Sequence, residues 1–393
     1  MKYLTRSVWI LSIVSLLTDT ASEMLYPVMP LYLKSIGFSI VLIGVLEGIA
    51  EATAGLSKGY FGNLSDVKGK RVPFIQAGYA LSAISKPLMA VFIYPLWVFF
   101  ARTIDRLGKG LRTGARDALL SDEASTENKA KVFGFHRSMD TLGAVIGPAF
   151  ALLYLYFNPE NYKTLFFIAF VPGLMAVLAT LLLKEKKKKI AEKKQSVHFF
   201  EFLHYWKQSP VRYRKLIIGL LAFTLFNSSD IFLLLKAKQS GLNDTMLIGV
   251  YIFYNLIYAL FAFPLGIMAD RIGLKKMFLA GLLLFSAVYF GMSSTGNTTM
   301  YFVLFFLYGI YAAATEGISK AWISNITERQ DTATAIGMYS SFQSLCTMLA
   351  SSLAGLIWFK FGAAAMFMIT GSAVMLIVLY FAVIIKEQQV SNT

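Results

Sequence analysis

The sequence predicts an all-α membrane protein with twelve transmembrane helices in two six-helix bundles. Three observations support this fold class: an apolar composition, apolar stretches at regular intervals, and a repeat of the first half in the second. Of the 393 residues, 56% are hydrophobic and only 15% are charged, and the mean hydropathy is +0.60. A soluble globular protein carries more charge than this, so the composition places the chain in a membrane.

The apolar stretches account for twelve membrane-spanning helices. A span needs about 20 mostly apolar residues. The stretches that meet this length are 7–33, 41–63, 73–94, 96–118, 133–157, 163–183, 214–236, 246–269, 275–293, 298–321, 333–358 and 363–385. No small-residue cleavage site follows the first stretch, so we expect a span there rather than a signal peptide.

The loops between these stretches set the orientation of the chain. Loops rich in Lys and Arg alternate with loops that carry few of either, and the positive-inside rule places the rich loops in the cytoplasm. We therefore expect both termini inside and the chain in the inner (plasma) membrane. The longest loop, 184–213, is basic and separates the predicted domains 1–183 and 214–393. Within it, residues 198–206 have the pattern of a short amphipathic helix.

Net charge, cysteine and histidine usage exclude several other classes of protein. The formal net charge is +15, but its basic residues cluster in loops, so membrane orientation explains them better than nucleic-acid binding. The single cysteine, Cys346, rules out an internal disulfide and a paired-cysteine metal site. His136, His198 and His204 lack metal-ligand spacing, and no HExxH or GxSxG motif is present. We therefore expect no metal site, no cofactor and no enzyme activity.

Three collinear matches between the two halves indicate an internal repeat. The sequence LIGV occurs at 42–45 and again at 247–250, and an aspartate four residues after a glycine occurs at 66 and at 270. A further set recurs at one constant offset: Gly114, Ala118, Ser121, Gly134, Ser138 and Leu142 return as Gly317, Ala321, Ser324, Gly337, Ser341 and Leu345. A parallel repeat of six spans predicts two similar bundles with a site between them.

One segment, 97–122, begins as an apolar span and then fills with charge. Its charged residues lie three or four apart for the most part, so a helix presents them as one stripe; they are Arg102, Asp105, Arg106, Lys109, Arg112, Arg116 and Asp117. Each cation near the bilayer centre costs about 2.5–3.5 kcal/mol. The stripe must therefore face protein or a water-filled path. Two alternatives remain open: a structural ion-pair cluster, and for 112–122 an ordinary wet helix end.

Acidic residues on the first two spans are the expected partners of this stripe. Asp19 and Glu23 are four residues apart and share one helix face, as do Glu47 and Glu51. At about 1.5 Å per residue, these acids reach depths similar to those of the stripe. Because a buried charge left alone neutralises itself, an excess of acids predicts a carboxyl that binds a proton reversibly.

The expected proton-coupling residues are Asp19, Glu23, Glu51, Arg102, Asp105 and Arg106. Lys86 in the third span is expected to neutralise a neighbouring acid. A static network that only fixes helix register is the alternative interpretation.

With these residues in view, the chain resembles the major facilitator superfamily over essentially its whole length. The superfamily's loop signature G-x-L-x-D-(R/K)-x-G-(R/K)-(R/K) reads GNLSDVKGKR at 62–71, with Val67 in place of a basic residue. A second copy at 266–276 reads GIMADRIGLKK. The resemblance implies a conformational latch built from Gly62, Asp66, Gly69, Lys70, Arg71, Arg112, Gly266, Asp270, Arg271 and Gly273. It also implies that Asp66 pairs with Arg112 or Arg116.

Two further signatures tilt the resemblance towards proton-coupled efflux antiporters. The fifth span carries Gly134, Gly143, Gly147 and Pro148 at the spacing of the antiporter motif, although its final glycine pair is Ala-Leu here. Small residues at such spacing permit close helix packing, and ordinary packing is the alternative reading. The fourth span resembles the signature R-x-x-x-x-x-G-x-G, whose arginine, Arg102 here, is usually tied to proton transfer.

The expected function is proton-coupled export of a small molecule, such as a drug, a metabolite or a siderophore-like compound, by alternating access. The expected substrate cavity contains Glu47, Lys109, Asp140, Asn227, Asp230, Tyr254, Tyr311, Glu316 and Lys320. The alternatives are proton-coupled uptake or uniport of an organic anion, export of a divalent metal and, more distantly, a non-transporting membrane receptor. The expected partners are the substrate, protons and the lipid bilayer. The resemblance implies a monomer.

Overall fold

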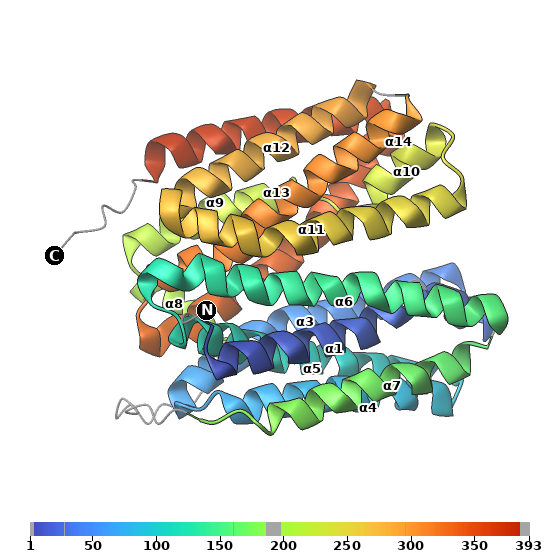
Figure 1. Ribbon diagram of the computed structural model, residues 1–393, viewed down its shortest axis with the longest axis horizontal. Coiled ribbons are helices and arrows are strands. Elements are labelled where there is room, and N and C mark those ends of the chain that lie inside the picture. The colour runs from blue at the N-terminus through green and yellow to red at the C-terminus, as the bar shows by residue number, and fades with distance from the viewer. Residues whose placement is uncertain (1–3, 27, 160, 186–197, 295, 386–393) are drawn as a thin grey trace. The chain divides into compact units, whose positions relative to one another are not determined.

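A computed structural model describes residues 4–26, 28–159, 161–185, 198–294 and 296–385 (Figure 1). Across these residues the secondary structure is helical, with no strand. Seven of the described helices are long and apolar enough, by length and composition, to cross a membrane. The charged segment 97–122 is helical along its whole length but lies outside these seven, because its charges lower its hydropathy.

The chain divides into two compact units, each built from discontinuous segments. Unit 1 contains Met1–Ser125, Met139–Gln208 and Thr327–Ser344, and unit 2 contains Thr126–Ser138, Ser209–Ile326 and Leu345–Thr393. The segment Thr126–Ser138 of the first sequence half therefore belongs to unit 2, and Thr327–Ser344 of the second half belongs to unit 1. The domain boundaries expected at 183 and 214 stay a prediction.

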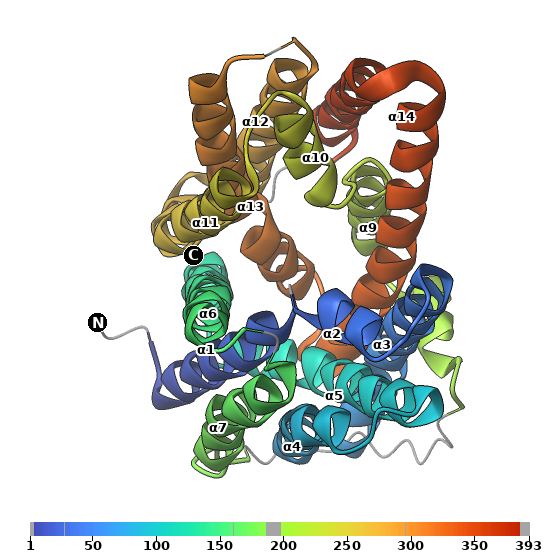
Figure 2. The ribbon, with the colours of Figure 1, turned by 90° about the vertical axis from the view of Figure 1, so that its right-hand side faces the viewer.

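Unit 1 contains the first seven α-helices, except for the start of α6. It also contains the beginning of α14 and the described end of the linker. The helices are α1 (Arg6–Leu25), α2 (Met29–Ser35), α3 (Ile40–Lys68), α4 (Val72–Val91), α5 (Pro95–Asp122), α6 (Lys129–Phe157), α7 (Tyr162–Thr180), η2 (Glu201–His204) and α8 (Tyr205–Gln208). Helix α4 packs against α5 and α7, α3 packs against α5, and α1 packs against α7 (Figure 2).

Local sequence signals explain where several of these helices begin and end. Thr5 caps α1 by accepting a hydrogen bond from Val8 N at 3.3 Å, and Ser39 caps α3 through Leu42 N at 3.2 Å. Helix α3 stops at Gly69, whose φ of 61° is left-handed and is best tolerated by glycine. The expected glycine of the loop signature therefore ends this helix.

Unit 2 is formed by the remaining helices and the first turns of α6. They are η1 (Thr126–Asn128), α9 (Val211–Thr224), α10 (Ile231–Gln239), α11 (Asp244–Ile272), α12 (Leu274–Ser294), α13 (Thr298–Asn325) and, from Leu345 onward, α14 (Thr332–Ile384). The short helix η3 (Arg329–Asp331) belongs to unit 1. Helix α13 packs against both α11 and α12. Within α14 the backbone of Gly362 is non-helical, with φ 84°, so this element is two helices, as the two stretches 333–358 and 363–385 predict.

Two of the expected spans are each broken into two helices, and the prediction of one continuous helix for each is wrong. The stretch 7–33 becomes α1 and α2, and the stretch 214–236 becomes α9 and α10. Asn227, Ser228, Ser229 and Asp230 lie in the second break. Such side chains bond readily to nearby backbone groups and so compete with helix formation. The break between α1 and α2 lies in the first span of the first repeat, and the break between α9 and α10 lies in the first span of the second repeat.

The linker segment 198–206 packs on unit 1 as the short helices η2 and α8. The side chains of Phe202 and Tyr205 are buried, and Phe199 stacks on Tyr60 of α3 with ring centroids 5.2 Å apart. Burial, reinforced by the charge of Asp331, raises the pKa of the Tyr205 hydroxyl. Apolar residues of the predicted amphipathic helix therefore face α3. Residues 186–197 of the expected linker lie outside the described residues.

Candidate functional site

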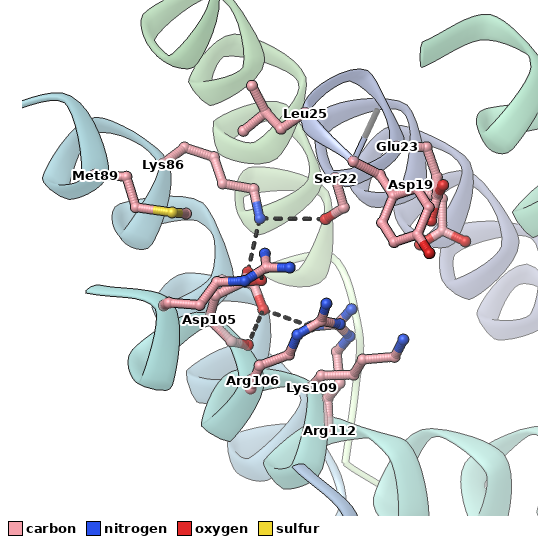
Figure 3. A pocket seen from close by; sticks show the side chains of 13 residues that line it. Asp19, Ser22, Glu23, Leu25, Lys86, Met89, Asp105, Arg106, Lys109 and Arg112 are labelled. Carbon is pink, nitrogen blue, oxygen red and sulfur yellow. Dashed lines mark hydrogen bonds and ion pairs between the residues drawn. The ribbon is translucent and has the colours of Figure 1, made fainter. Parts of the chain in front are cut away.

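A pocket in unit 1 brings residues of the charged segment together with acids of the first span (Figure 3). Its lining comes from α1, α4 and α5 and consists of Asp19, Ser22, Glu23, Leu25, Tyr26, Ser82, Lys86, Met89, Arg102, Asp105, Arg106, Lys109 and Arg112. Five of these side chains are basic and three are acidic. The stripe of α5 thus faces protein groups, as the cost of exposing it to lipid requires.

Lys86 and Asp105 form the tightest ion pair of the pocket. Lys86 Nζ lies 2.7 Å from Asp105 Oδ1, and both side chains are buried. Asp105 also accepts a hydrogen bond from Ser85 Oγ at 3.2 Å and lies 3.5 Å from Arg102 Nη1. Lys86 further donates to Ser22 Oγ at 3.2 Å. Lys86 therefore neutralises an acid in the neighbouring helix, as its position in the third span predicts.

A second acidic group is a pair of carboxyls, Asp19 of α1 and Asp140 of α6. Ser15 Oγ of α1, one turn before Asp19, donates to Asp140, and a Cβ added at Gly143 of α6 would lie 3.0 Å from Asp19 Cβ. Two neighbouring carboxyl groups repel each other when both are ionised. Sequence reasoning placed Asp140 among the substrate residues and did not foresee this partner.

The glycines of the fifth span explain how these two carboxyls meet. A Cβ added at Gly143 would lie 2.6 Å from Leu16 O, and one at Gly147 would lie 2.6 Å from Thr20 O. Only glycine allows α6 to approach the backbone of α1 this closely. Asp140 precedes Gly143 by three residues and so lies on the same face of α6. At the other end of this helix, Gly134 approaches Ala262 O of unit 2 in the same way.

Two basic residues of the pocket, Arg112 and Lys109, have no carboxylate within ion-pairing distance among the side chains that the structure describes. Arg112 donates to Ser82 Oγ at 2.6 Å and lies over the Tyr79 ring, with Cζ 4.6 Å from the centroid. Its Nε is buried without a hydrogen-bond partner. Lys109 lines the same pocket and is exposed.

The other acids expected in the network are less closely tied to the pocket. Glu51 lies 3.7 Å from Arg106, and its side chain is 45% exposed. It does not contribute to the pocket lining, whereas Glu23 does. The side chain of Glu47 lies outside the part of the chain that the structure describes.

The loop signature builds a helix cap on α14. Asp66 Oδ2 accepts hydrogen bonds from Thr334 N at 2.6 Å and from Thr334 Oγ1 at 2.7 Å, and Asp66 also pairs with Arg71. The expected pairing of Asp66 with Arg112 or Arg116 is wrong. Arg112 is held at Ser82 and Tyr79, and Arg116 pairs with Asp117 at 3.0 Å. The nearer Arg71 lies within the same loop and needs no long reach.

The second copy of the signature builds a matching cap on α6. Asp270 accepts hydrogen bonds from Ala130 N at 3.0 Å and from Lys131 N at 2.8 Å, in the first turn of α6. Such caps satisfy backbone donors that a helix leaves unpaired. Gly266 lies against Ala130 in this contact, and Gly62 lies against Ala333 in the first. Among the remaining signature residues, Lys70 O accepts from Ser65 Oγ at 2.7 Å, Arg271 lies in the last turn of α11, and Gly273 ends that helix with φ 104°.

Unit 2 holds a different arrangement around Asp230. Tyr308 Oη donates to Asp230 Oδ1 at 2.5 Å, and Tyr254 Oη donates to Asp230 Oδ2. Tyr311 packs on Phe285 with ring centroids 4.9 Å apart. The expected cavity includes Tyr254 and Tyr311 but not Tyr308, because an aromatic stripe on a helix does not reveal which hydroxyl reaches an acid.

The other residues expected in the cavity from the second half also lie in unit 2. Glu316 pairs with Arg137 of α6 at 3.0 Å, and Arg137 donates to Tyr258 Oη at 2.5 Å. Asn227 lies in the break between α9 and α10, and its side-chain oxygen is buried without a partner. Lys320 lies on α13, one turn beyond Glu316.

No group of three or more His, Cys, Asp or Glu among the described residues could hold a metal ion. The charged residues that line the pocket are five basic and three acidic side chains.

Comparison with known proteins identifies the family. The model of the Major Facilitator Superfamily matches residues 11–255 and 237–392. The chain belongs to the Major Facilitator Superfamily. Members of this superfamily are secondary transporters rather than enzymes, so the chain is an integral membrane transporter with the twelve-helix fold of the superfamily.

Two relatives and one solved structure illustrate the similarity. An uncharacterised MFS-type transporter of Methanocaldococcus jannaschii is 30% identical over 361 residues, which cover 90% of this chain and 89% of the relative. The quinolone resistance protein NorA of Staphylococcus aureus is 24% identical over 163 residues, covering 42% of this chain and 41% of NorA. The crystal structure of the human organic anion transporter MFSD10 has a TM-score of 0.77 at 16% identity and covers 96% of this chain and 99% of its own.

Proposed function

We propose that this transporter couples the movement of a small molecule to protons, and that the Asp19–Asp140 pair carries the transported proton. The observation that carries the proposal is the meeting of two carboxyl-bearing side chains where α6 packs on α1: Asp140 accepts from Ser15 Oγ, one turn from Asp19, and a Cβ at Gly143 would lie 3.0 Å from Asp19 Cβ. A shared proton sits between groups that repel each other once both are ionised, so the pair can release and rebind it. Asp19 also lines the pocket, so its charge acts on whatever the pocket binds.

The remaining buried charges are less suited to this role. Asp105 is fixed by Lys86 at 2.7 Å and faces Arg102, so protonating it would leave two cations without a counter-charge. Asp230 is satisfied by two tyrosine hydroxyls and has no neighbouring carboxyl hydrogen-bonded to it. Of the expected proton-coupling residues, Asp19 is therefore retained as the carrier, and Asp140 joins it.

Alternating access is supported by the two caps. Asp66 and Asp270 each bind the first turn of a helix that belongs in sequence to the other half of the chain. In our proposal these hydrogen bonds form in one state of the transport cycle and break in the other. Residues 62–71 and 266–276 then act as a pair of latches, with the termini and the linker in the cytoplasm of a cell with an inner (plasma) membrane.

Export is the direction favoured by the antiporter-type glycines of the fifth span and by the similarity to NorA. A second candidate is uptake of an organic anion together with protons. Five basic side chains against three acidic ones in the pocket favour this second candidate. In both cases the protein acts as a monomer.

The test is a transport assay in proteoliposomes that carry a pH-sensitive dye in the lumen. A panel of drugs, organic acids and sugars is added outside, and the dye reports proton movement with wild type, Asp140→Asn and Asp230→Asn. We expect at least one compound to move protons with wild type and Asp230→Asn but not with Asp140→Asn. Equal proton movement in all three proteins would remove the carboxyl pair from the mechanism.

A further inference from the structure

The pocket of unit 1 has a surplus of positive charge that its own residues do not neutralise. Three carboxyls line it beside five basic groups. Asp105 is already paired with Lys86 at 2.7 Å, Asp19 lies beside the second carboxyl Asp140, and Glu51, outside the lining, lies 3.7 Å from Arg106. The surplus is clearest at Arg112 and Lys109, for which no carboxylate among the described side chains lies within ion-pairing distance.

Arg112 is a buried guanidinium with an unused donor. Its side chain lines the pocket, the residue is only 5% exposed, and its Nε has no hydrogen-bond partner. Its other contacts, Ser82 Oγ at 2.6 Å and the Tyr79 ring at 4.6 Å, are neutral. A buried charge is costly unless an opposite charge and hydrogen bonds offset it. An oxyanion supplies both, because a guanidinium donates to carboxylate and phosphate oxygens in a matched planar geometry.

Lys109 supplies a second cation one turn away on α5. It is exposed, and Figure 3 shows its side chain extending from α5 into the pocket beside Arg106. Residues 109 and 112 lie three apart, so both side chains occupy the same helix face. An exposed ammonium on a flexible chain can close on a bound anion, whereas the buried Arg112 is already in place.

We propose that this pocket binds a small organic anion through a carboxylate or phosphate group, with Arg112 and Lys109 as its ligands. The inference rests on the proposed function for the transport step and names the substrate class of the same site. Arg102 and Arg106 line the same pocket and add to its positive field.

The position of the carboxyl pair predicts how the anion and the proton affect each other. Glu23 of α1 and Lys109 and Arg116 of α5 are among the charged groups around the pair. When the pair loses its shared proton, it gains a negative charge that attracts Lys109 and repels the anion. The anion and the proton therefore favour each other's binding, as thermodynamic linkage requires. Such mutual support favours movement of the two in the same direction, which is the second candidate function.

The experiment measures anion binding to the purified full-length protein in detergent. The probes are inorganic phosphate, sulfate, benzoate and citrate, with glucose as the neutral control and tetramethylammonium as the cationic control. Chloride holds the ionic strength constant, and the shift in unfolding temperature reports binding. We expect at least one oxyanion to raise the unfolding temperature, with affinity increasing by up to about tenfold for each pH unit that the solution is lowered.

Substitution of Lys109 tests the assignment of the ligand. Because Lys109 is exposed, Lys109→Gln should fold normally and weaken anion binding by about tenfold. Lys163→Gln is the matched control, since Lys163 is an exposed lysine at the start of α7 outside the pocket. Arg112→Gln should weaken binding further if it folds. The inference is overturned if no oxyanion binds better than chloride, if tetramethylammonium binds instead, or if Lys109→Gln binds like wild type.

Asp140→Asn separates this inference from the proposed function. We expect the variant to bind the anion at all pH values with the affinity that wild type reaches at low pH. Anion binding without proton movement in liposomes would contradict the proposed function and leave the anion site standing. Proton movement driven by a cation or a neutral compound would contradict the anion site and leave proton coupling standing.

Discussion

Helices α5 and α13 occupy equivalent places in the sequence repeat but carry different chemistry. An offset of 203 residues relates Gly114 to Gly317. At this offset the charged residues with which α5 lines the pocket have uncharged counterparts in α13: Arg102 corresponds to Phe305, Asp105 to Tyr308, Arg106 to Gly309, Lys109 to Ala312 and Arg112 to Thr315. Lys86 of α4 corresponds to Tyr289 of α12 by the same offset. The ion pair of unit 1 is thus replaced by a pair of tyrosines in unit 2.

The comparison of α5 with α13 distinguishes the residues that both repeats share for folding from the charged residues that we assign to transport. Both copies keep the glycines that allow close packing and the aspartate that caps a helix of the other half. The charged residues with which α5 lines the pocket have uncharged counterparts in α13, and Asp140 corresponds to Gln343, so the charged pocket and the carboxyl pair are not repeated at the equivalent positions of unit 2. We infer that proton coupling is a property of unit 1, while Asp230 of unit 2 is held by tyrosine hydroxyls and stays out of proton transfer.

The largest expected contrast lies at Lys86 and its counterpart Tyr289. Lys86→Met leaves Asp105 buried without its closest counter-charge, which should lower the free energy of unfolding by about 3–5 kcal/mol. Tyr289→Phe removes only a hydroxyl and should cost less than about 1.5 kcal/mol. Unfolding in mixed detergent micelles measures both. Equal losses would contradict the view that unit 1 alone depends on a buried ion pair.

A matched pair of hydroxyls distinguishes the two buried acids. Ser15 donates to Asp140 and Tyr308 donates to Asp230, so Ser15→Ala and Tyr308→Phe each remove one hydrogen bond to an acid. Each change should cost about 1.5–3 kcal/mol if the acid is ionised. We expect only Ser15→Ala to shift the pH profile of transport. A shift with Tyr308→Phe would bring Asp230 into proton coupling and weaken the comparison.

The close approach of α6 to α1 can be tested with a single methyl group. Gly143→Ala places a Cβ 2.6 Å from Leu16 O, so overpacking should cost about 1–3 kcal/mol. It should also move Asp140 away from Asp19 and uncouple proton movement from substrate movement. The control is Gly249→Ala in α11, where a Cβ meets no atom within 4 Å. Normal coupling in Gly143→Ala would argue that these glycines serve packing alone.

The smallest contrast is between the two caps. Asp66→Asn and Asp270→Asn should each weaken a helix cap by about 1 kcal/mol, because an amide accepts hydrogen bonds less strongly than a carboxylate. Asp66→Asn should cost more, since Asp66 also pairs with Arg71. Labelling of a cysteine introduced at Thr334 or at Ala130 measures how often each cap opens. Faster labelling in the Asp270→Asn protein than in the Asp66→Asn protein would contradict the prediction that the Asp66 cap loses more stability.

The sequence predicts the fold class and the residues of the charged pocket because both depend on local patterns. Apolar stretches locate the spans, and the spacing of Arg102, Asp105 and Arg106 places them on one face. The partner of Asp66 was predicted incorrectly, since the latch was inferred from a resemblance and the choice between Arg71 and a more distant arginine depends on side-chain reach. The breaks after α1 and α9 were also missed, because apolar residues continue on both sides of each.

The carboxyl pair could not be predicted because its residues are far apart in the chain. Asp19 and Asp140 meet only when Gly143 and Gly147 bring α6 onto α1, and nothing in either segment alone specifies that contact. Tyr308 presents the same difficulty in unit 2, where several tyrosines share one face and only two reach Asp230. Long-range packing, rather than periodicity, decides both cases.

The central claim is that unit 1 holds a transported proton between Asp19 and Asp140. Infrared difference spectroscopy of the protein in lipid, titrated through neutral pH, observes the carbonyl band of a protonated carboxyl directly. We predict such a band in wild type and in Asp230→Asn, decreasing as the pH rises, and no such band in the double variant Asp19→Asn with Asp140→Asn. A band that persists unchanged in the double variant, or disappears in Asp230→Asn, would contradict the claim.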